Sequence, residues 1–389
     1  MKIIVAIDSF KGCLTSVEAN RAAAEGIRRA CPDVETVQVP VSDGGEGWLD
    51  AFQAAWGGTL VDVAVRDPLM RPIVAQYLVK GSTAVIEIAR ASGLTLLSPD
   101  ERRPLLASSY GTGQLVADAI HRGCTHIIVG LGGSATSDCG IGMLRAVIDS
   151  CGHRANHPSG TPLRGSWDEV AALRSVRFTI ATDVTNPLCG ENGAAHVFAP
   201  QKGATCEMVK MLDARARRFA AVSARHFGYD RQDWPGAGAA GGLGYAFLQY
   251  MKADCHSGID LLLDSLQVGG RSCGEAARFD ELLRDASLVV TGEGAADRQT
   301  LMGKLPFGIL RRAKAVKVPV ALLAGSVKDR QQLLAAGFSR VDCINPPGLS
   351  AEEAMNPETA RRNIALLMEK RCRQMKAGSQ KNDDSSEYM

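Results

Sequence analysis

The stretch IIVAIDSFKG (residues 3–12) decides the fold, because a run of apolar, mostly β-branched residues ends directly in an acid, a hydroxyl, a lysine and a glycine. Apolar runs also end in a mix of glycine, acid and hydroxyl residues in VQVPVSDGGEG (37–47), IIVGLGGSATSD (127–138) and LVVTGEGAAD (288–297). Open α/β sheets bind ligands beyond the carboxyl ends of their strands. Glycines expose backbone N–H groups to an anion, and carboxylates can hold a metal or accept a proton. The four stretches therefore predict phosphate and metal chemistry on a small molecule.

Size and composition indicate a two-domain globular protein. The 389 residues exceed one ordinary core, and 46% apolar with 22% charged residues is typical of soluble proteins. A net charge of +2 without a basic stripe argues against nucleic-acid binding, and no apolar run reaches the ~20 residues of a membrane helix. The 11 cysteines contain no CxxC pair, and the chain starts with a strand rather than a signal peptide, so we expect a cytoplasmic protein.

The order of the expected elements indicates a discontinuous domain. Strands and helices alternate at both ends of the chain, which is typical of a doubly wound parallel sheet of the flavodoxin or Rossmann type. Short alternating strands at 60–65, 73–79 and 83–88 predict an antiparallel meander between them. We predict a doubly wound α/β domain (1–60 and 284–376), an inserted mixed α/β domain (61–283), a cleft between them, and a disordered tail (377–389).

The first three loops combine acids or hydroxyls with glycine. Lys11, close to Asp8 and Ser9, could pair with a carboxylate or phosphate of a ligand. Asp43 and Glu46 crowd around glycines, although an ordinary turn needs one glycine and one Asp or Asn. The segment 130–138 is a candidate phosphate cradle, whose N–H and hydroxyl groups would point at an anion near the following helix.

Two later segments also follow predicted strands. In TDVTNPL (182–188), Asp183 and Asn186 could ligate Mg²⁺, or Asp183 could accept a hydroxyl proton; an Asx turn ahead of Pro187 explains the segment equally well. TGEGAADRQTLMGK (291–304) holds two acids and several other polar groups, where a plain connector averages ~2–6 residues and needs none of them. PQKG (200–203) offers a further cation in a tight turn.

Several common motifs are missing from the sequence. There is no G-x-x-x-x-G-K-[ST], which excludes a P-loop enzyme. No G-x-G-x-x-G follows the first strand, which weakens a dinucleotide-binding interpretation. The H-E-x-x-H signature is absent as well.

Taken in order, the motifs resemble the glycerate kinase type 1 family. They are DSFKG (8–12), DGGEG (43–47), GTGQL (111–115), GLGGSAT (130–136), NPL (186–188), PQKG (200–203) and TGEG (291–294), the last followed by Asp297, Gln299-Thr300 and Gly303-Lys304. The resemblance spans about residues 1–370. It implies a bacterial ATP-dependent kinase of D-glycerate with two α/β domains and 2-phosphoglycerate as its product.

This resemblance and the needs of phosphoryl transfer suggest a role for each loop. Asp183 is the first candidate for the base and Asp43 the second, with Lys11 on the glycerate carboxylate or the transferred phosphoryl group. Asp183 and Asn186 are the expected Mg²⁺ ligands. Phosphate contacts are expected from Gly132, Gly133, Ser134 and Lys304, and substrate contacts from Asp8, Ser9, Glu46, Glu293, Asp297 and Gln299.

Trp48 departs from the family pattern, which usually has Thr at this position, and is expected to narrow or reshape the acceptor pocket. The alternative functions are a kinase of another small hydroxy acid, a non-catalytic glycerate sensor, and a hydroxy-acid oxidoreductase suggested by the fold alone. We expect ATP and D-glycerate as partners, with neither nucleic acid nor membrane, and the sequence leaves a homo-oligomer open.

Overall fold

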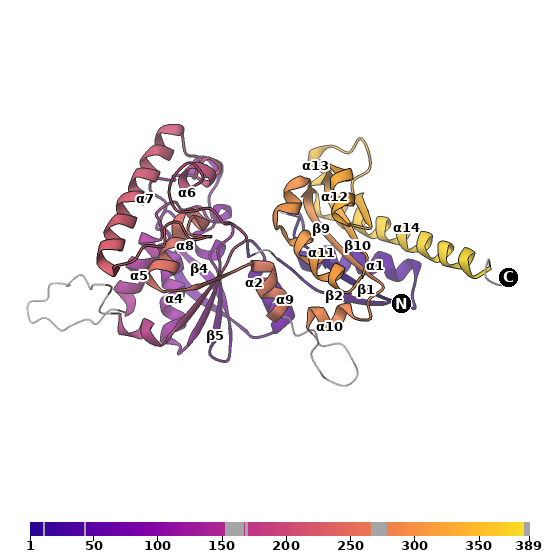
Figure 1. Cartoon of the computed structure of the whole chain (residues 1–389), viewed down its shortest axis with the longest axis horizontal. Coiled ribbons are helices and arrows are strands. Elements are labelled where there is room, and N and C mark those ends of the chain that lie inside the picture. Colours follow the sequence, from indigo (N-terminus) through magenta and orange to yellow (C-terminus); the bar gives the residue numbers. More distant parts are fainter. Residues whose placement is uncertain (11, 43, 152–166, 168–169, 266–277, 385–389) are drawn as a thin grey trace, which may run out of the picture. The chain divides into compact units, whose positions relative to one another are not determined.

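The computed structural model describes residues 1–10, 12–42, 44–151, 167, 170–265 and 278–384 (Figure 1). Contacts between residues divide the chain into two compact units. Unit 1 contains residues 1–42, 50–56 and 262–389, and unit 2 contains 43–49 and 57–261. The division passes through helices α2 (Trp48–Trp56) and α9 (Gly258–Ser265). The predicted α/β architecture with parallel sheets is confirmed, and the cleft between domains stays a prediction.

Unit 1 is built on a five-stranded sheet in which every neighbouring pair is parallel, in the order β11-β10-β9-β1-β2. Its strands are β1 (Lys2–Ile7), β2 (Glu35–Gln38), β9 (Leu288–Ala296), β10 (Val320–Val327) and β11 (Arg340–Cys343). Because β1 lies between β2 and β9, the two ends of the chain share one sheet, as the sequence predicts.

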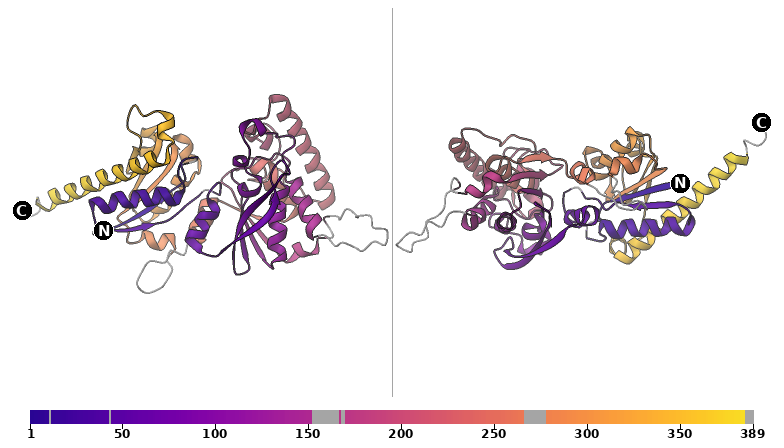
Figure 2. Two further views of the ribbon diagram at one scale, coloured as in Figure 1. Left: turned by 180° about the vertical axis from the view of Figure 1, so that it is seen from behind. Right: turned by 90° about the horizontal axis from the view of Figure 1, so that it is seen from below.

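Helices α1 (Ser16–Ala30) and α14 (Pro357–Asp384) pack against each other on one face of this sheet. Figure 2 shows the two helices next to each other. They share a buried cluster with β1 and β9, which includes Ile3 and Ile7 of β1 and Ile364 of α14. The other helical elements of unit 1 are α10 (Phe279–Leu283), η6 (Arg298–Met302), α11 (Leu305–Ala315), α12 (Arg330–Ala336) and α13 (Ala351–Ala354).

Gly26 allows α1 and α14 to approach this closely. A Cβ atom at Gly26 would lie 2.1 Å from the backbone oxygen of Ala365, which real Cβ atoms do not tolerate. Both residues are buried. The contact involves backbone on the α14 side, so it cannot be relieved by a side-chain rotation.

We expect Gly26→Ala to destabilise the protein, although Gly to Ala inside a helix ordinarily gains about 1 kcal/mol. Overpacking at this contact should cost about 1–3 kcal/mol and outweigh that gain. Urea unfolding measures the difference. Arg21→Ala, at an exposed position of α1, is the control and should change stability by about 0.5 kcal/mol or less. A Gly26→Ala protein as stable as the parent would contradict the packing argument.

Unit 2 contains a six-stranded mixed sheet in the order β3-β4-β5-β6-β7-β8. Its strands are β3 (Thr59–Arg66), β4 (Pro72–Lys80), β5 (Thr83–Glu87), β6 (His126–Gly130), β7 (Arg177–Ala181) and β8 (Asp254–His256). The first three form the predicted antiparallel meander, and β5 to β8 are parallel. The carboxyl ends of β5, β6 and β7 therefore meet at one edge.

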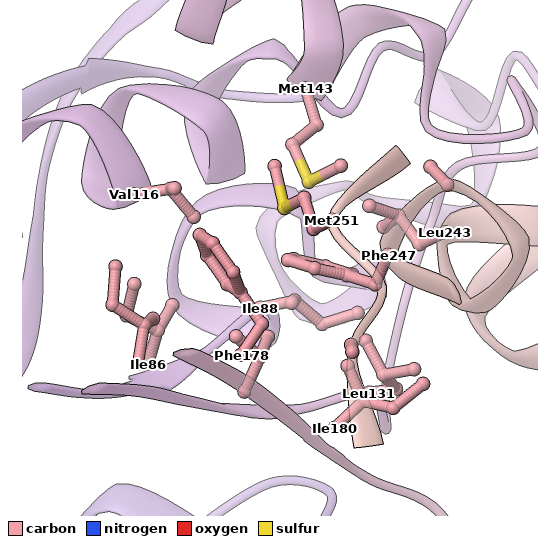
Figure 3. Packing of buried hydrophobic residues seen from close by; sticks show 14 of the residues in the cluster. Ile86, Ile88, Val116, Leu131, Met143, Phe178, Ile180, Leu243, Phe247 and Met251 are labelled. Carbon is pink, nitrogen blue, oxygen red and sulfur yellow. The ribbon is translucent and has the colours of Figure 1, made fainter. Parts of the chain in front are cut away.

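The core of unit 2 packs helices against this sheet. Figure 3 shows Phe178 of β7 and Phe247 of α8, whose ring centroids are 6.1 Å apart, with Ile180 and Met143 in the same buried cluster. The helical elements are α3 (Ala89–Ser92), α4 (Tyr110–His121), α5 (Ile141–Cys151), α6 (Ala194–Phe198), α7 (Cys206–Phe227) and α8 (Ala239–Tyr250), with η1 (Leu94–Leu96), η2 (Pro99–Glu101), η4 (Ala171–Ser175) and η5 (Pro200–Lys202). Among the described residues, no helix has the length and apolar character needed to cross a membrane.

The strand β9 runs further than the sequence predicts. A loop is expected from Thr291, but β9 continues through Gly292 and Glu293 to Ala296. The reason is the partner strand β10, which pairs with β9 as far as Val327 opposite Ala296. Tertiary pairing here outweighs the low strand preference of glycine.

Three segments lie elsewhere than the predicted domain ranges place them. Residues 262–283 group with unit 1, since Arg312 of α11 binds Asp264 and Asp280. Residues 43–49 group with unit 2. The expected disordered tail begins inside α14, which continues to Asp384 because extending an established helix costs far less than starting one.

Candidate functional site

Two glycine segments pack directly on each other at the carboxyl edge of β6. The N–H of Gly132 donates to the carbonyl oxygen of Gly44 at 2.9 Å, and a Cβ at Gly132 would lie 2.2 Å from the Cα of Gly45. The loop 44–47 therefore belongs to this edge of unit 2, and not to the doubly wound domain as the sequence predicts. Gly132 serves this packing with its own amide, so its predicted contact with phosphate stays a prediction.

Trp48, which follows Gly47, is enclosed by the same glycine loop. Trp48 is fully buried, and a Cβ at Gly130 would lie 2.5 Å from its ring atom Cε3. The indole thus supports the backbone of the glycine loop. Its predicted effect on an acceptor pocket would have to pass through that loop.

Glu87 is a buried acid that sequence reasoning missed. It ends β5, and its carboxylate accepts the N–H of Leu49 at 2.9 Å and that of Gly47 at 3.4 Å, at the start of α2. The Nε of Arg90 lies 3.7 Å from the same carboxylate. An acid at the end of a predicted strand was the available signal. Glu46 itself is exposed.

The segment Ser134–Ser137 surrounds a buried lysine. The ammonium of Lys202 donates to Ser134 Oγ at 2.8 Å and to the Thr136 carbonyl oxygen at 2.6 Å. Lys202 is 2% exposed, and burial lowers its pKa to about 7, against the opposing charge of Asp138. The sequence shows Lys202 as a cation in a tight turn, but not that the turn folds back onto the glycine loop.

Asp138 has a structural role at this edge. Its Oδ2 accepts the N–H and the hydroxyl of Ser109, each at 2.9 Å, and the N–H of Gly142 at 3.1 Å. The carboxylate thereby caps the start of α5 and ties it to the start of α4. These three hydrogen bonds to one oxygen explain why an acid stands at position 138, where the glycine loop ends and α5 is about to begin.

The loop after β7 brings the predicted metal ligands to the same edge. Asp183 Oδ1 accepts the N–H of Gly258 at 3.2 Å, at the first residue of α9. Asn186 Nδ2 donates to the carbonyl oxygen of Asn192 at 2.8 Å. In the described part of the chain, no three His, Cys, Asp or Glu side chains converge as a metal cluster. A magnesium ion here would therefore depend on one carboxylate and on oxygens of its ligand.

Unit 1 has its own cluster, formed by the carboxyl half of β9 and the segment that follows it. Glu293 is 7% exposed, accepts the hydroxyl of Thr300 at 2.6 Å, and lies 3.4 Å from Lys304 Nζ. Burial raises the pKa of Glu293 above its usual value, against the opposing effects of Thr300 and Lys304. The structure thus brings two predicted residues, Glu293 and Lys304, into direct contact, and Thr300 binds the other oxygen of the same carboxylate.

The remaining predicted residues of unit 1 shape turns. Asp8 is buried, and its Oδ1 accepts the N–H of Ser9 at 2.7 Å. Asp297 Oδ1 accepts the N–H of Gln299 at 2.7 Å and caps η6. The predicted catalytic residues Lys11 and Asp43 lie outside the described residues.

A separate cavity of about 550 Å³ lies at the opposite end of β7. Trp167, Tyr250 and Arg174 contribute to its lining, together with Arg177, the first residue of β7. It therefore opens near the amino ends of the parallel strands, away from the loops described above.

We expect Glu293→Gln to gain stability relative to the parent protein as the pH rises from about 4 to about 7. The raised pKa means that the folded parent binds a proton more tightly than the unfolded chain. The parent therefore loses stability as the pH rises through this pKa, whereas glutamine cannot ionise. Thermal melting across this pH range measures the difference.

Glu101→Gln is the control of opposite sign. The pKa of Glu101 is lowered, first by the backbone N–H of Ser98, so this variant should lose stability relative to the parent with rising pH. A Glu293→Gln effect that does not change with pH would contradict a raised pKa of the buried carboxyl.

The sequence matches one protein family along almost its whole length. The family model described as the glycerate kinase family matches residues 3–376. The chain is 39% identical to a glycerate kinase of Bacillus subtilis (strain 168), over 91% of this chain and 93% of that protein. It is 39% identical to a glycerate 2-kinase of Escherichia coli (strain K12), over 85% of this chain and 86% of that protein.

A solved structure is similar over nearly the whole chain. It is described as a glycerate kinase 2 from Salmonella typhimurium LT2, with 36% identity and a TM-score of 0.77. The alignment covers 98% of this chain and 99% of that one.

Proposed function

Because this chain belongs to the glycerate kinase family, we propose that it transfers a phosphoryl group from ATP to D-glycerate and forms 2-phospho-D-glycerate and ADP. The name of the Escherichia coli relative, glycerate 2-kinase, supports the 2-position. The structural observation that carries the proposal is the donor-rich segment Ser134–Ser137 with the buried Lys202. We also propose a cytoplasmic setting, in keeping with the free cysteines of the described residues.

Phosphoryl transfer requires positioning and neutralisation of charge more than covalent chemistry. In this proposal, Gly133 and Ser134 bind phosphate oxygens, and Lys304 neutralises phosphate charge. The buried Glu293 accepts a hydrogen bond from a substrate hydroxyl, as it does from Thr300. Lys11 binds the glycerate carboxylate or the transferred group.

The residues after β7 fit a magnesium ion by their chemistry. Mg²⁺ prefers oxygen ligands and usually needs one or two carboxylates besides phosphate oxygens and water. Asp183 offers a carboxylate and Asn186 an amide oxygen, since its amide nitrogen is already bound to Asn192. A bound Mg²⁺ supplies positive charge that neutralises the transferring phosphoryl group.

Asp183 has two proposed roles, general base and Mg²⁺ ligand, and its hydrogen bond with Gly258 makes it difficult for one carboxylate to fill both. One oxygen already accepts the N–H of Gly258, so a single carboxylate would have to serve as both base and metal ligand. We therefore propose Asp183 as the base, which accepts the proton of the attacking hydroxyl, and Asp43 as the base if Asp183 instead holds the metal.

We expect Asp183→Asn to lower kcat by about 10²–10⁴-fold, because general-base catalysis contributes about that much. The affinity for ATP should change far less. Steady-state kinetics at varied ATP and varied Mg²⁺ separate the two roles, since a lost metal ligand raises the Mg²⁺ requirement. Asp62→Asn, on the exposed side of β3, is the matched control. Unchanged turnover in Asp183→Asn would remove this residue from the mechanism.

Phosphorus NMR of the product decides the position of transfer. With ATP and D-glycerate, we expect ADP and the phosphorus resonance of 2-phosphoglycerate, split by a single carbon-bound proton. A 3-phosphoglycerate signal would retain the kinase but reject the proposed product. Binding of D-glycerate without ADP release would favour a sensor, and a change in nicotinamide absorbance would favour an oxidoreductase.

A further inference from the structure

Lys202 is an unusual residue because it is a buried cation without a carboxylate partner. It is 2% exposed and donates to one hydroxyl and one carbonyl oxygen, both neutral. Among the described residues, no carboxylate lies within ion-pair distance of it, and Asp138 acts on it only from farther away. An ammonium taken out of water without a counter-charge is strongly unfavourable. The position of Lys202 therefore favours an anion as a further partner.

The groups around Lys202 are hydrogen-bond donors that lack acceptors. Ser134 Oγ already accepts from Lys202, so its own hydrogen is available to another group. The hydroxyls of Thr136 and Ser137 are buried and make no hydrogen bond with the described residues. A buried hydroxyl without a partner is rare in native proteins. Three hydroxyls of one short segment thus share the same lack of an acceptor.

We infer that Lys202 provides the positive charge of an oxyanion site formed by Ser134, Thr136 and Ser137. The lysine acts as a positioning residue, since it holds Ser134 Oγ and the Thr136 carbonyl and lends its charge to the segment. The ligand group is an oxyanion, either a phosphate of the nucleotide or the carboxylate of the acceptor. The inference rests on the proposed function for the identity of these two ligands, but not for the site itself.

The fold keeps this segment fixed without the ligand. Backbone bonds hold both ends of it: the N–H of Ala135 donates to Ser92 at 2.9 Å, and that of Cys139 to Gly241 at 3.1 Å. A Cβ at Gly241 would lie 2.0 Å from the Thr136 carbonyl oxygen, so α8 also packs closely against the segment. Lys202 adds the third anchor, from η5.

Calorimetric titration with three separate probes tests the inference: ADP, inorganic phosphate and D-glycerate. We expect Lys202→Met to lower the affinity of the protein for at least one probe ten-fold or more. Loss confined to ADP and phosphate identifies the oxyanion as a nucleotide phosphate, and loss confined to D-glycerate identifies it as the acceptor carboxylate. Lys210→Met, at an exposed position of α7, is the control and should bind all three as the parent does.

Melting temperatures distinguish this site from a merely structural lysine. Methionine removes an uncompensated buried charge, so we expect the ligand-free variant to melt no lower than the parent and to lose the rise in melting temperature that the affected ligand gives. A lower melting temperature with an intact ligand-dependent rise, or affinities within two-fold of the parent for all probes, would overturn the inference.

Lys202→Arg provides a second test if the methionine variant does not fold. Burial lowers the lysine pKa to about 7, so the parent loses this charge between about pH 6 and 8.5, whereas arginine keeps it. As the pH rises, the affinity of the parent for the affected probe should fall relative to that of the arginine variant. Ionisation of the ligand changes both affinities equally, so it cancels in their ratio. Asp138 and Arg102, the charged groups of the neighbouring segments, are present in both proteins. An unchanged ratio would contradict the inference.

Kinase activity separates the two possible failures. If the parent protein forms no ADP from ATP and D-glycerate, the proposed function fails, yet loss of phosphate binding in Lys202→Met still supports the oxyanion site. If the parent forms ADP and Lys202→Met shows the same kcat and the same KM for ATP and for D-glycerate as the parent, the proposed function stands and only the oxyanion site is rejected.

Discussion

The close approach of two glycine segments is the constraint on which the edge of unit 2 depends. Gly132 contacts Gly45 so tightly that no side chain fits between them, and its amide is bound to Gly44. Trp48 supports the same loop at Gly130. Because these contacts involve backbone and a fully buried ring, the loop holds its turn without any ligand. A binding segment fixed in this way loses little conformational entropy when a ligand arrives.

Each unit contains a buried ionisable side chain whose charged form is disfavoured by burial. In unit 2 the buried group is Lys202, whose pKa burial lowers to about 7. In unit 1 it is Glu293, whose pKa burial raises. Shifted groups of this kind gather at functional sites, because proteins seldom keep an unfavourable buried charge for stability alone. Lys202 contacts the loop that follows β6, and Glu293 lies in the carboxyl half of β9, so each is near the sheet edge at which open α/β sheets bind their ligands.

Alternating apolar and polar residues predicted the meander, the repeated order of strands and helices predicted the parallel sheet, and glycine content predicted the loops, because each of these patterns can be recognised in a short stretch of sequence. Three features depend on partners far along the chain and could not be predicted. The strand β9 extends past Thr291 because β10 pairs with it, residues 44–47 join unit 2 through Gly132, and Lys202 reaches the loop from 66 residues beyond Thr136. Glu87 is a further example: the sequence shows an acid near the end of a predicted strand, but not that its carboxylate binds the N–H of Leu49.

The engaged amide of Gly132 changes which part of the loop can bind an anion. Glycines at 130 and 132 are required where the loop packs on Trp48 and Gly45, so they serve the scaffold. The groups without acceptors lie further along, at the hydroxyls of Thr136 and Ser137. The glycine-rich sequence therefore marks where the backbone packs closely, and the serine and threonine residues that follow it form the anion-binding part in our proposal. A substitution of Trp48 would therefore affect a bound anion indirectly, by shifting the glycine segment that the indole supports.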